Sequence, residues 1–330
     1  MWSRIWADLM PGESDVGVTR PRPPGGARAE QAGAAVLVWA RDLGLVTDAD
    51  EKKRLAAMRL GEFACVAVPG ASARDLELTA QWAAFICLVD DRFDRRRVDV
   101  RPEEAGAVFD GLLGVLCGRA ARPSSGTEHA LDDLWWRTAP RMSLQWRERF
   151  VADYRDFALA TREEAADRTE RGRLGLGDYV LRRRRTITAL PMADVLECTA
   201  RAPWPGLPGG VDLMSALRLA AADVAGWTND LVSAEDDLRE DRDNLVTVLS
   251  RERACSPRSA REQVTRMRDR RLEDFHALAA SLTAMAAPGT ERDRVRSFVN
   301  TLGSFVAATL YWLGVTDRFE ARWSLNRRSM

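Results

Sequence analysis

Two clusters of oxygen-bearing side chains have a spacing that suits a metal ion, and the first runs from Asp90 to Asp94. It reads Asp-Asp-Arg-Phe-Asp and ends an apolar helical stretch that begins at Trp82. On a helix, Asp90 and Asp94 lie one turn apart on the same face, so their carboxylates can converge on one metal ion or bridge two. Clustered carboxylates repel one another unless a cation neutralises them, which favours a bound divalent metal. The alternative is an exposed helix end that pairs with the three arginines at 95–97.

The second cluster runs from Asn229 to Asp237 and follows another apolar stretch. Asn229, Ser233 and Asp237 fall at positions i, i+4 and i+8, so an amide oxygen, a hydroxyl and a carboxylate lie along one stripe of a helix. This all-oxygen set carries one formal charge and suits a magnesium ion whose other ligands are water and substrate phosphate. Asparagine inside a helix has a low helix propensity, which favours a functional role for Asn229 over an exposed acidic turn.

The composition of the chain restricts the classes of metal and partner. Only two histidines occur among the 330 residues, which argues against zinc hydrolases, Ser-His-Asp enzymes and paired-histidine iron sites. The five cysteines are widely spaced and form no CxxC motif, so we expect neither a disulfide framework nor a zinc site, and a cytoplasmic location. The 49 basic and 49 acidic residues give a net charge of zero, so we expect no nucleic acid partner.

The hydrophobic periodicity of the elements that must position these clusters is helical throughout. Apolar residues recur three and four apart over 30–43, 49–66, 73–93, 102–119, 128–136, 143–171, 176–200, 212–239, 244–251, 257–287 and 290–319. Alternation typical of strands is weak. The sequence therefore predicts an all-α fold: an irregular N-terminal strap at 1–28, then a single large helical bundle at 29–330 with a deep central cavity. We expect no membrane span, because the apolar stretch 302–315 is too short, and no targeting signal.

The order and spacing of these motifs resemble those of bacterial class I terpene synthases, also called terpene cyclases. The resemblance rests on the apolar helix that ends in Asp-Asp-Arg-Phe-Asp, on Asn-Asp-Leu-Val-Ser-Ala-Glu-Asp-Asp 139 residues later, and on Asp-Asn-Leu-Val-Thr-Val-Leu at 243–249. Further family-like segments lie at 39–46, 63–88, 179–186 and 312–319, so the resemblance covers nearly the whole chain. It implies a class I terpenoid synthase fold, an isoprenoid diphosphate substrate and three magnesium ions, and it leaves a homodimer open.

The resemblance also implies roles for single residues. The first cluster would bind two magnesium ions through Asp90 and Asp94, and the three donors of the second cluster would bind the third ion. Arg183 lies where the family has an arginine that senses the diphosphate, and Arg318 matches a second diphosphate-binding arginine. Because four arginines are consecutive at 182–185, helix geometry lets only one or two of them face the substrate, and Arg184 is the alternative to Arg183.

The carbocation left after diphosphate departs needs apolar walls with π faces, because a nucleophile would quench it. Helix geometry places Ala83, Ile86 and Cys87 on the same face as Asp90, so we expect them to line the wall below it. Phe63 is a further aromatic candidate because it lies near the motifs, and the resemblance adds Ile187 and Trp312. Ile187 falls in the stretch 186–188, where the family has a break in a helix.

The implied reaction is the magnesium-dependent ionisation and cyclisation of a linear isoprenoid diphosphate, with farnesyl diphosphate and a sesquiterpene as the first choice. Geranylgeranyl diphosphate and a diterpene stay open, because wall residues such as Ala83 and Cys87 are small. A trans-prenyltransferase would carry a second Asp-rich motif, and a non-catalytic helical scaffold would make both clusters coincidental. The sequence departs from the family at Asp237, where glutamate is usual, and at Phe319, where tyrosine is usual.

Overall fold

The computed structural model of the chain describes residues 26–94, 102–119, 123–170, 173–240, 242–316 and 318. The regular structure in these ranges is helical and contains no strand, which confirms the predicted all-α class. Residues 1–25 of the predicted strap lie outside the described residues, and the first described helix begins at Ala27. The helices fall into two compact units, each described below by itself. The deep central cavity stays a prediction.

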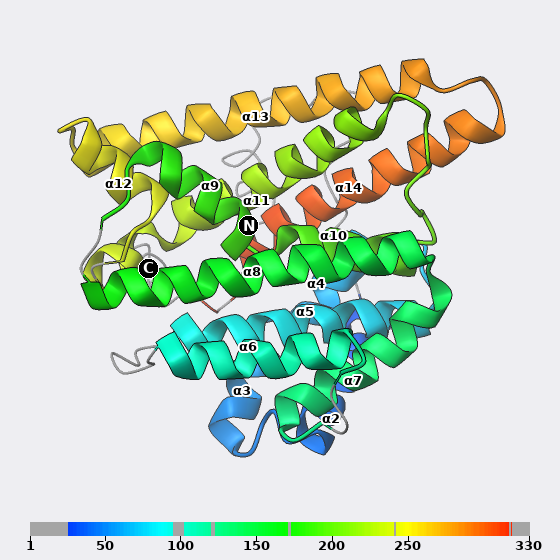
Figure 1. Cartoon of the computed structure of the whole chain (residues 1–330), viewed down its shortest axis with the longest axis horizontal. Helices are drawn as coiled ribbons and strands as arrows, with labels where there is room; N and C mark the ends of the chain where they lie inside the picture. The colour runs from blue at the N-terminus through cyan, green and yellow to red at the C-terminus, as the bar shows by residue number, and fades with distance from the viewer. Residues whose placement is uncertain are drawn as a thin grey trace. The chain divides into compact units, whose positions relative to one another are not determined.

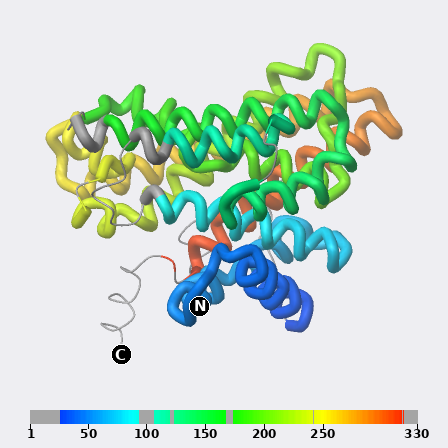
Figure 2. The backbone as a smooth tube through the Cα atoms, turned by 60° about the horizontal axis from the view of Figure 1, so that its bottom comes forward, coloured from blue at the N-terminus to red at the C-terminus, as the bar shows by residue number. Residues whose placement is uncertain are grey.

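The first unit, here called the α5 unit, comprises the described residues of 24–172 together with 190–204. Its elements are α2 (Ala27–Asp42), α3 (Ala49–Ala57), α4 (Leu60–Ala67), α5 (Ala73–Asp94), α6 (Pro102–Leu116), α7 (Gly126–Thr138), the short 3-10 helix η1 (Ala139–Arg141), α8 (Leu144–Glu170) and most of α10 (Ala189–Thr199). Helix α2 packs against α4 and α5, and Figure 2 shows the blue α2 beside them. This packing gives α5, which carries the first cluster, a buried support.

The second unit, here called the α11 unit, comprises the described residues of 173–189 and those from 205 onward. Its helices are α9 (Leu176–Thr186), α11 (Val211–Arg239), α12 (Leu245–Glu252), α13 (Pro257–Met285) and α14 (Thr290–Val315). Helix α11 packs along α13 and also contacts α9, α12 and α14 (Figure 1). The second cluster therefore lies on α11, the helix that contacts each of the other helices of its unit.

The stretch predicted as one helix over 49–66 is two helices, and the prediction was wrong in this detail. Between α3 and α4, Arg59 adopts the left-handed conformation with φ of 55°. In α4, a Cβ atom on Gly61 would lie 2.1 Å from the carbonyl oxygen of Ala29 in α2. The backbones of α4 and α2 approach this closely only because residue 61 is glycine. The close packing of these two helices therefore overrides the continuous helical periodicity of the sequence.

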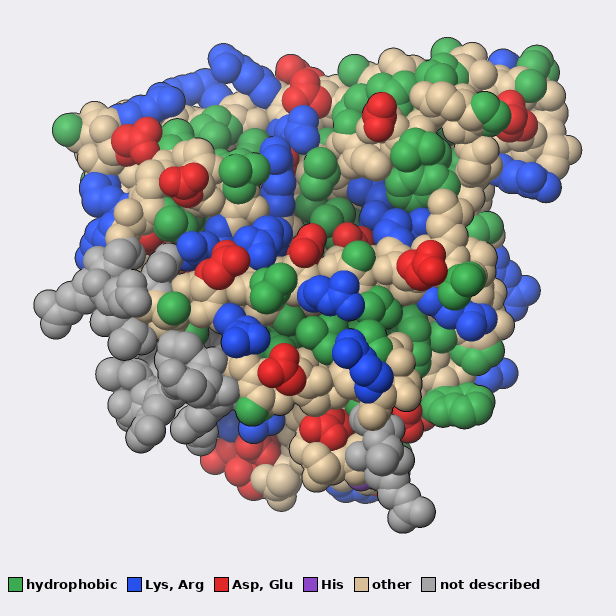
Figure 3. All heavy atoms as spheres, viewed as in Figure 1, with side chains coloured by type: hydrophobic (Ala, Val, Ile, Leu, Met, Phe, Trp, Pro, Cys, Tyr) green, Lys and Arg blue, Asp and Glu red, His purple; other side chains and the backbone are tan. Residues whose placement is uncertain are grey.

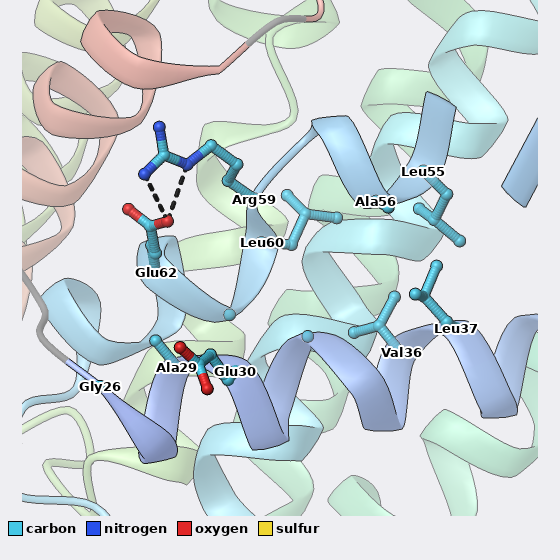
Figure 4. Close-up of a pocket in the computed structure, with 12 residues that line it drawn as sticks. Gly26, Ala29, Glu30, Val36, Leu37, Leu55, Ala56, Arg59, Leu60 and Glu62 are labelled. Carbon is cyan, nitrogen blue, oxygen red and sulfur yellow. Dashed lines mark hydrogen bonds and ion pairs between the residues drawn. The ribbon is translucent and has the colours of Figure 1, made fainter. Parts of the chain in front are cut away.

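A cavity of about 240 Å³ lies among α2, α3 and α4 (Figure 4). Aliphatic side chains line most of it, including Val36, Leu37 and Leu55. Arg59 and Glu62 also line it and form an ion pair, with 2.6 Å between Nη2 and Oε1. None of its lining residues belongs to the predicted site, so this cavity is a separate feature of the α5 unit.

Aromatic packing fixes α5 within its unit. Trp82 and Phe85 are each 1% exposed, and their rings lie edge to face with centroids 6.0 Å apart. The ring of Trp82 also lies 5.3 Å from that of Phe150 in α8, and its Nε1–H donates to Thr138 Oγ1 of α7 at 2.9 Å. Aromatic pairs of this kind and a satisfied indole donor favour a single rotation of the helix. The direction in which Asp90 projects is therefore set by the core.

Helix α14 is long and apolar enough to cross a membrane by length and composition, and no other helix of the described ranges meets that test. However, 78% of its apolar window is buried inside the protein. This helix is therefore a core helix of the α11 unit, in agreement with the expectation of no membrane span. On the face drawn in Figure 3, basic and acidic side chains are intermingled, which fits the zero net charge.

Candidate metal and diphosphate site

The three oxygen donors of the second cluster lie on consecutive turns of α11, as their spacing predicts. Ser233 is buried and the other two are half-buried. The hydroxyl of Ser233 donates to Asp237 Oδ2 at 2.6 Å, so two of the donors are in direct contact. Every residue from 220 to 228, in the preceding turns, is buried. This packing fixes the rotation of α11 and therefore the direction in which the three donors project. We call Asn229, Ser233 and Asp237 together the donor stripe, or simply the stripe.

Arg183 of α9 contacts the first donor of the stripe. Its Nη2 donates to Asn229 Oδ1 at 2.7 Å, and its Nε lies 2.8 Å from Asp230 Oδ1. Asp230 is buried and also accepts hydrogen bonds from Tyr179 Oη at 2.8 Å and from the backbone N–H of Leu245 at 3.2 Å. Burial raises the pKa of Asp230, and the nearby Arg183 guanidinium and Tyr179 hydroxyl limit this rise by stabilising the charged form. The guanidinium of Arg183 is therefore held beside the donor stripe.

Arg184 is engaged elsewhere. It forms a two-pronged ion pair with Asp223 of α11, with Nε donating to Oδ1 at 2.6 Å and Nη2 donating to Oδ2 at 2.9 Å. Asp223 is 1% exposed and also accepts from Arg271 Nε of α13 at 2.8 Å. The hydrogen bond with Asp223 raises the pKa of Arg184. Arg184 therefore joins α9 to α11 and α13, whereas Arg183 lies beside Asn229.

Replacing Arg184 by alanine is expected to lower the free energy of unfolding by about 3 kcal/mol, because the buried Asp223 loses one of its two cations. Urea denaturation followed by circular dichroism measures this change. The matched control is Arg258→Ala, since Arg258 pairs with Glu262 in an exposed ion pair whose loss is expected to cost less than about 1 kcal/mol. Equal stability of the two variants would contradict the structural role of Arg184.

Asn244 holds the other end of the stripe, and its role was missed by sequence reasoning. Its Nδ2 donates to Asp237 Oδ2 at 2.7 Å and to the Asp230 carbonyl at 2.9 Å, and lies 3.3 Å from Ser233 Oγ. Asn244 also caps α12 in a reciprocal arrangement with Thr247. The signal in the sequence was an asparagine before an apolar helical run, which is a typical helix N-terminus. No sequence pattern indicates that the Asn244 side chain also contacts Asp230, Ser233 and Asp237 of α11.

The helix break expected at 186–188 lies between α9 and α10. Thr188 has φ of 58°, a costly conformation for a β-branched residue, and its hydroxyl donates to the Ile187 carbonyl at 2.5 Å. A Cβ atom on Gly226 of α11 would contact Arg183 Cγ at 3.4 Å and Ile187 Cβ at 3.7 Å. The end of α9 therefore lies directly on α11, which brings Ile187 next to the turn that precedes Asn229.

The predicted site residues of the α5 unit lie on α4 and α5. Asp90 is half-buried near the C-terminal end of α5. Ala83 and Cys87 are buried and Ile86 is half-buried on the preceding turns of the same helix. Phe63 is 6% exposed on α4, which packs against α5. The structure thus brings the predicted wall residues and Asp90 to neighbouring turns of two adjoining helices.

Three further predicted positions lie near the limits of the described residues. Asp94 is the last residue of α5, but its side chain lies outside the described part of the structure. The guanidinium carbon of Arg318 lies 6.0 Å from the ring centroid of Trp312, which is 8% exposed on α14. Phe319 lies outside the described residues. The contact between Arg318 and Trp312 joins a predicted diphosphate contact to a predicted pocket wall.

The donor stripe fits a magnesium ion by its chemistry. It offers an amide, a hydroxyl and a carboxylate oxygen on one helix face, and magnesium prefers such hard oxygen ligands. The described residues contain no group of three histidine, cysteine or acidic side chains that could hold a metal. Two of the three donors of the stripe are of other types, namely an asparagine and a serine. In the α11 unit, Asn229, Ser233 and Asp237 are therefore the residues that would hold an ion.

A helical fold that combines an oxygen-only donor stripe with a neighbouring guanidinium suits an enzyme that binds a divalent metal and an anionic phosphate ester. The chain belongs to terpene synthase family 2, because the family model "Terpene synthase family 2, C-terminal metal binding" matches residues 81–274. The matched stretch includes both clusters and Arg183. This assignment confirms the resemblance and makes the protein a terpene synthase of a metal-binding family.

Similar proteins agree with the family over most of their length. The 7-epi-alpha-eudesmol synthase of Streptomyces viridochromogenes, named as cyclising (2E,6E)-farnesyl diphosphate, is 29% identical over 301 residues, 88% of each chain. Pentalenene synthase of Streptomyces exfoliatus is 26% identical over 325 residues, 96% of this chain and 95% of its own. The crystal structure of a-eudesmol synthase has 29% identity and a TM-score of 0.79, and the match covers 92% of this chain and 98% of that one.

Proposed function

We propose that this protein catalyses the magnesium-dependent ionisation and cyclisation of farnesyl diphosphate to a sesquiterpene, with release of diphosphate. The observation that carries the proposal is the stripe of Asn229, Ser233 and Asp237 with the Arg183 guanidinium bonded to it, in a chain of a metal-binding terpene synthase family. Relatives named as farnesyl diphosphate cyclases support this substrate. The Asn/Ser/Asp stripe, in place of a second Asp-rich motif, favours cyclisation over chain elongation.

The metal-binding residues of the proposal come from both clusters. Asn229, Ser233 and Asp237 would hold one magnesium ion, and Asp90 and Asp94 would hold two more. Bound magnesium supplies positive charge that stabilises the leaving diphosphate, so that the allylic carbon–oxygen bond can ionise without a general acid. The stripe donates one negative charge and two neutral oxygens, which leaves the ion with net positive charge for the diphosphate.

Two arginines of the α11 unit bind the diphosphate in this proposal. Arg183 presents several N–H donors in one plane, a geometry that matches two phosphate oxygens at once. Its position beside Asn229 puts these donors next to a proposed metal ligand. Arg318 adds a second permanent cation.

The pocket residues of the proposal exclude nucleophiles from the carbocation. In the α5 unit, Phe63 contributes a π face and Ala83, Ile86 and Cys87 contribute small or aliphatic surface. Cys87 is buried, and a buried thiol behaves as a small hydrophobic side chain. In the α11 unit, Ile187 and the ring of Trp312 serve the same purpose. Aromatic faces stabilise a nearby cation through their quadrupole.

Asp237 replaces the glutamate that is usual in the family, and the structure supports its use as a ligand. Its side chain is shorter by one methylene, yet its Oδ2 lies 2.6 Å from Ser233 Oγ and is held by Asn244 at 2.7 Å. These two contacts fix the carboxylate in the stripe. The shorter carboxylate is therefore ordered by local hydrogen bonds.

The proposed reaction is tested by incubating the purified protein with magnesium and, in parallel, geranyl, farnesyl or geranylgeranyl diphosphate. We expect cyclic C15 products from farnesyl diphosphate by gas chromatography–mass spectrometry, with equimolar diphosphate release that stops when the metal is chelated. Cyclic C20 products from geranylgeranyl diphosphate alone would reassign the protein as a diterpene synthase. Absence of diphosphate release from all three substrates, with folded protein, would reject the proposed function.

We also propose a cytoplasmic location, which fits the five free cysteines at 65, 87, 117, 198 and 255. The linear isoprenoid diphosphate is the only partner that the proposed reaction needs. A homodimer stays a proposal from the family resemblance.

A further inference from the structure

The carboxylate of Asp237 is engaged on both of its oxygens by groups of the protein itself. Oδ2 accepts from the Ser233 hydroxyl at 2.6 Å and from Asn244 Nδ2 at 2.7 Å. Oδ1 lies 2.9 Å from Nη2 of Arg242, which forms an ion pair with it. The Ser233 and Asn244 donors are neutral, so Arg242 alone among these three contacts cancels the charge of the carboxylate. The charged ligand of the proposed magnesium site is therefore already paired with a cation.

The position of Arg242 is fixed by its backbone as well as by its side chain. Its backbone N–H donates to the carbonyl of Asp237 at 2.9 Å, and its own carbonyl accepts from the Thr247 hydroxyl at 3.4 Å. Its guanidinium also lies 3.1 Å from Glu240 Oε2. The side chain is 24% exposed, so water screens the ion pair with Asp237 only in part. These contacts hold the guanidinium against Asp237 rather than in solvent.

An arginine contacts each end of the donor stripe, but the two contacts differ in the charge of the group that the arginine faces. Arg183 bonds to the neutral amide oxygen of Asn229, and its charge is balanced by Asp230, which is not a proposed ligand. Arg242 instead faces the only formally charged donor of the stripe. A divalent cation that binds Asp237 must either displace this guanidinium or tolerate it at close range, and like charges repel. The competition between metal and arginine therefore concerns Asp237 specifically.

We propose that Arg242 is an internal counter-cation of Asp237 that competes with the metal and sets the metal affinity of the stripe. This inference rests on the proposed role of Asp237 as a metal ligand. Arg242 is a positioning residue in this proposal, because it acts on the metal through Asp237. It balances the charge of the Asp237 carboxylate, and it weakens the binding of a metal ion at that carboxylate, also when diphosphate is bound.

The inference is tested by titrating the protein with Mn²⁺ in the presence of inorganic diphosphate and measuring free Mn²⁺ by electron paramagnetic resonance. Arg242→Gln is expected to raise the Mn²⁺ affinity of the weakest site by about 10-fold, the lower end of the effect of groups that surround metal ligands. Arg242→Lys keeps the charge and is expected to bind Mn²⁺ as the wild type does. The matched control is Arg251→Gln, because Arg251 pairs at 3.0 Å with Asp243, a neighbouring carboxylate outside the stripe.

A further variant, Asp237→Asn, separates this inference from the proposed function. Loss of one bound Mn²⁺ in Asp237→Asn supports Asp237 as a ligand, and unchanged binding would reject that role and the inference with it. If Asp237→Asn loses an ion while Arg242→Gln matches or falls below the wild type in affinity, the counter-cation role of Arg242 is wrong and the ligand role stands. Thermal unfolding by circular dichroism checks that each variant is folded. If Arg242→Gln does not fold, the Mn²⁺ affinity of Arg242→Lys tests the inference instead. Because lysine keeps the positive charge, an affinity above that of the wild type would contradict competition by charge.

Discussion

Replacing Asn229 by leucine is expected to lower kcat for farnesyl diphosphate by about 1,000-fold, because the stripe loses a neutral oxygen ligand and an apolar side chain takes its place. A magnesium ion held by Asn229 would supply positive charge to the diphosphate, and this charge would matter most as the bond breaks and negative charge develops on the leaving group. We therefore expect the effect on kcat rather than on KM. Product formation is measured by gas chromatography–mass spectrometry at saturating magnesium and substrate.

We expect the Asn229→Leu variant to fold. Asn229 is half-buried, and the substitution leaves in place the two partners of the Arg183–Asp230 ion pair, which are 2.8 Å apart in the structure. Far-UV circular dichroism is therefore expected to match that of the wild type. The control on the same helix is Glu235→Gln, which alters an exposed carboxylate that pairs with Arg239 at 3.7 Å. Wild-type turnover in Asn229→Leu, or an equal loss in Glu235→Gln, would mean that the stripe is not the metal site.

Replacing Arg183 by lysine is expected to lower kcat/KM for farnesyl diphosphate by about 100-fold, because a lysine ammonium is a point charge that cannot offer the parallel donors of a guanidinium. In the structure Arg183 donates a hydrogen bond to Asn229 through Nη2 and forms an ion pair with Asp230. Lysine keeps a positive charge near the buried Asp230, so the variant is expected to fold. The affinity for inorganic diphosphate with magnesium, measured by calorimetry, should fall in parallel.

The neighbouring arginine supplies the control for this experiment. Arg182→Lys changes the same chemistry one residue earlier on α9, about 100° around the helix, and is expected to alter kcat/KM by less than about 3-fold. Equal losses in Arg182→Lys and Arg183→Lys would show that the arginine which contacts diphosphate has been assigned to the wrong position. Rescue of diphosphate affinity is not expected from Arg184, because both of its prongs are bonded to Asp223.

Each donor of the stripe is satisfied by a contact with another group of the protein. Asn229 accepts from Arg183, Ser233 donates to Asp237, and Asn244 and Arg242 contact Asp237 from the far end. A polar group that is removed from water costs free energy unless it is hydrogen-bonded. The surrounding arginines and Asn244 therefore keep the stripe ordered and preorganised before substrate arrives.

Some parts of the candidate site follow from local sequence alone. The spacing of Asn229, Ser233 and Asp237 fixes their common helix face, because side chains four residues apart on a helix are always neighbours. The same rule placed Ala83, Ile86 and Cys87 on the turns before Asp90. The break at Ile187 and Thr188 was also expected, from the family resemblance. These are features of one helix or one junction, so no distant part of the chain is needed to predict them.

Other parts depend on contacts between residues that are far apart in the sequence. The sequence favours Arg183 and keeps Arg184 as the alternative, whereas their different partners on α11, Asp230 for Arg183 and Asp223 for Arg184, appear only in the structure. The stretch 49–66 is divided into α3 and α4 at Arg59, and Gly61 of α4 then packs closely on α2. The local sequence pattern does not identify these contacts. Hydrophobic periodicity indicates which face of a helix is buried, but it does not indicate which other helix packs against that face.

The sequence by itself therefore determined the helical class and the shared helix face of the proposed oxygen donors. Periodicity of apolar residues and the i, i+4 rule are local, and the scarcity of histidine is a matter of composition. Only the tertiary structure decided which arginine faces the stripe and how Asn244 and Arg242 engage Asp237. The physical reason is that hydrogen bonds and ion pairs are short and directional, so their partners are selected by packing at the scale of an ångström, which sequence spacing does not specify.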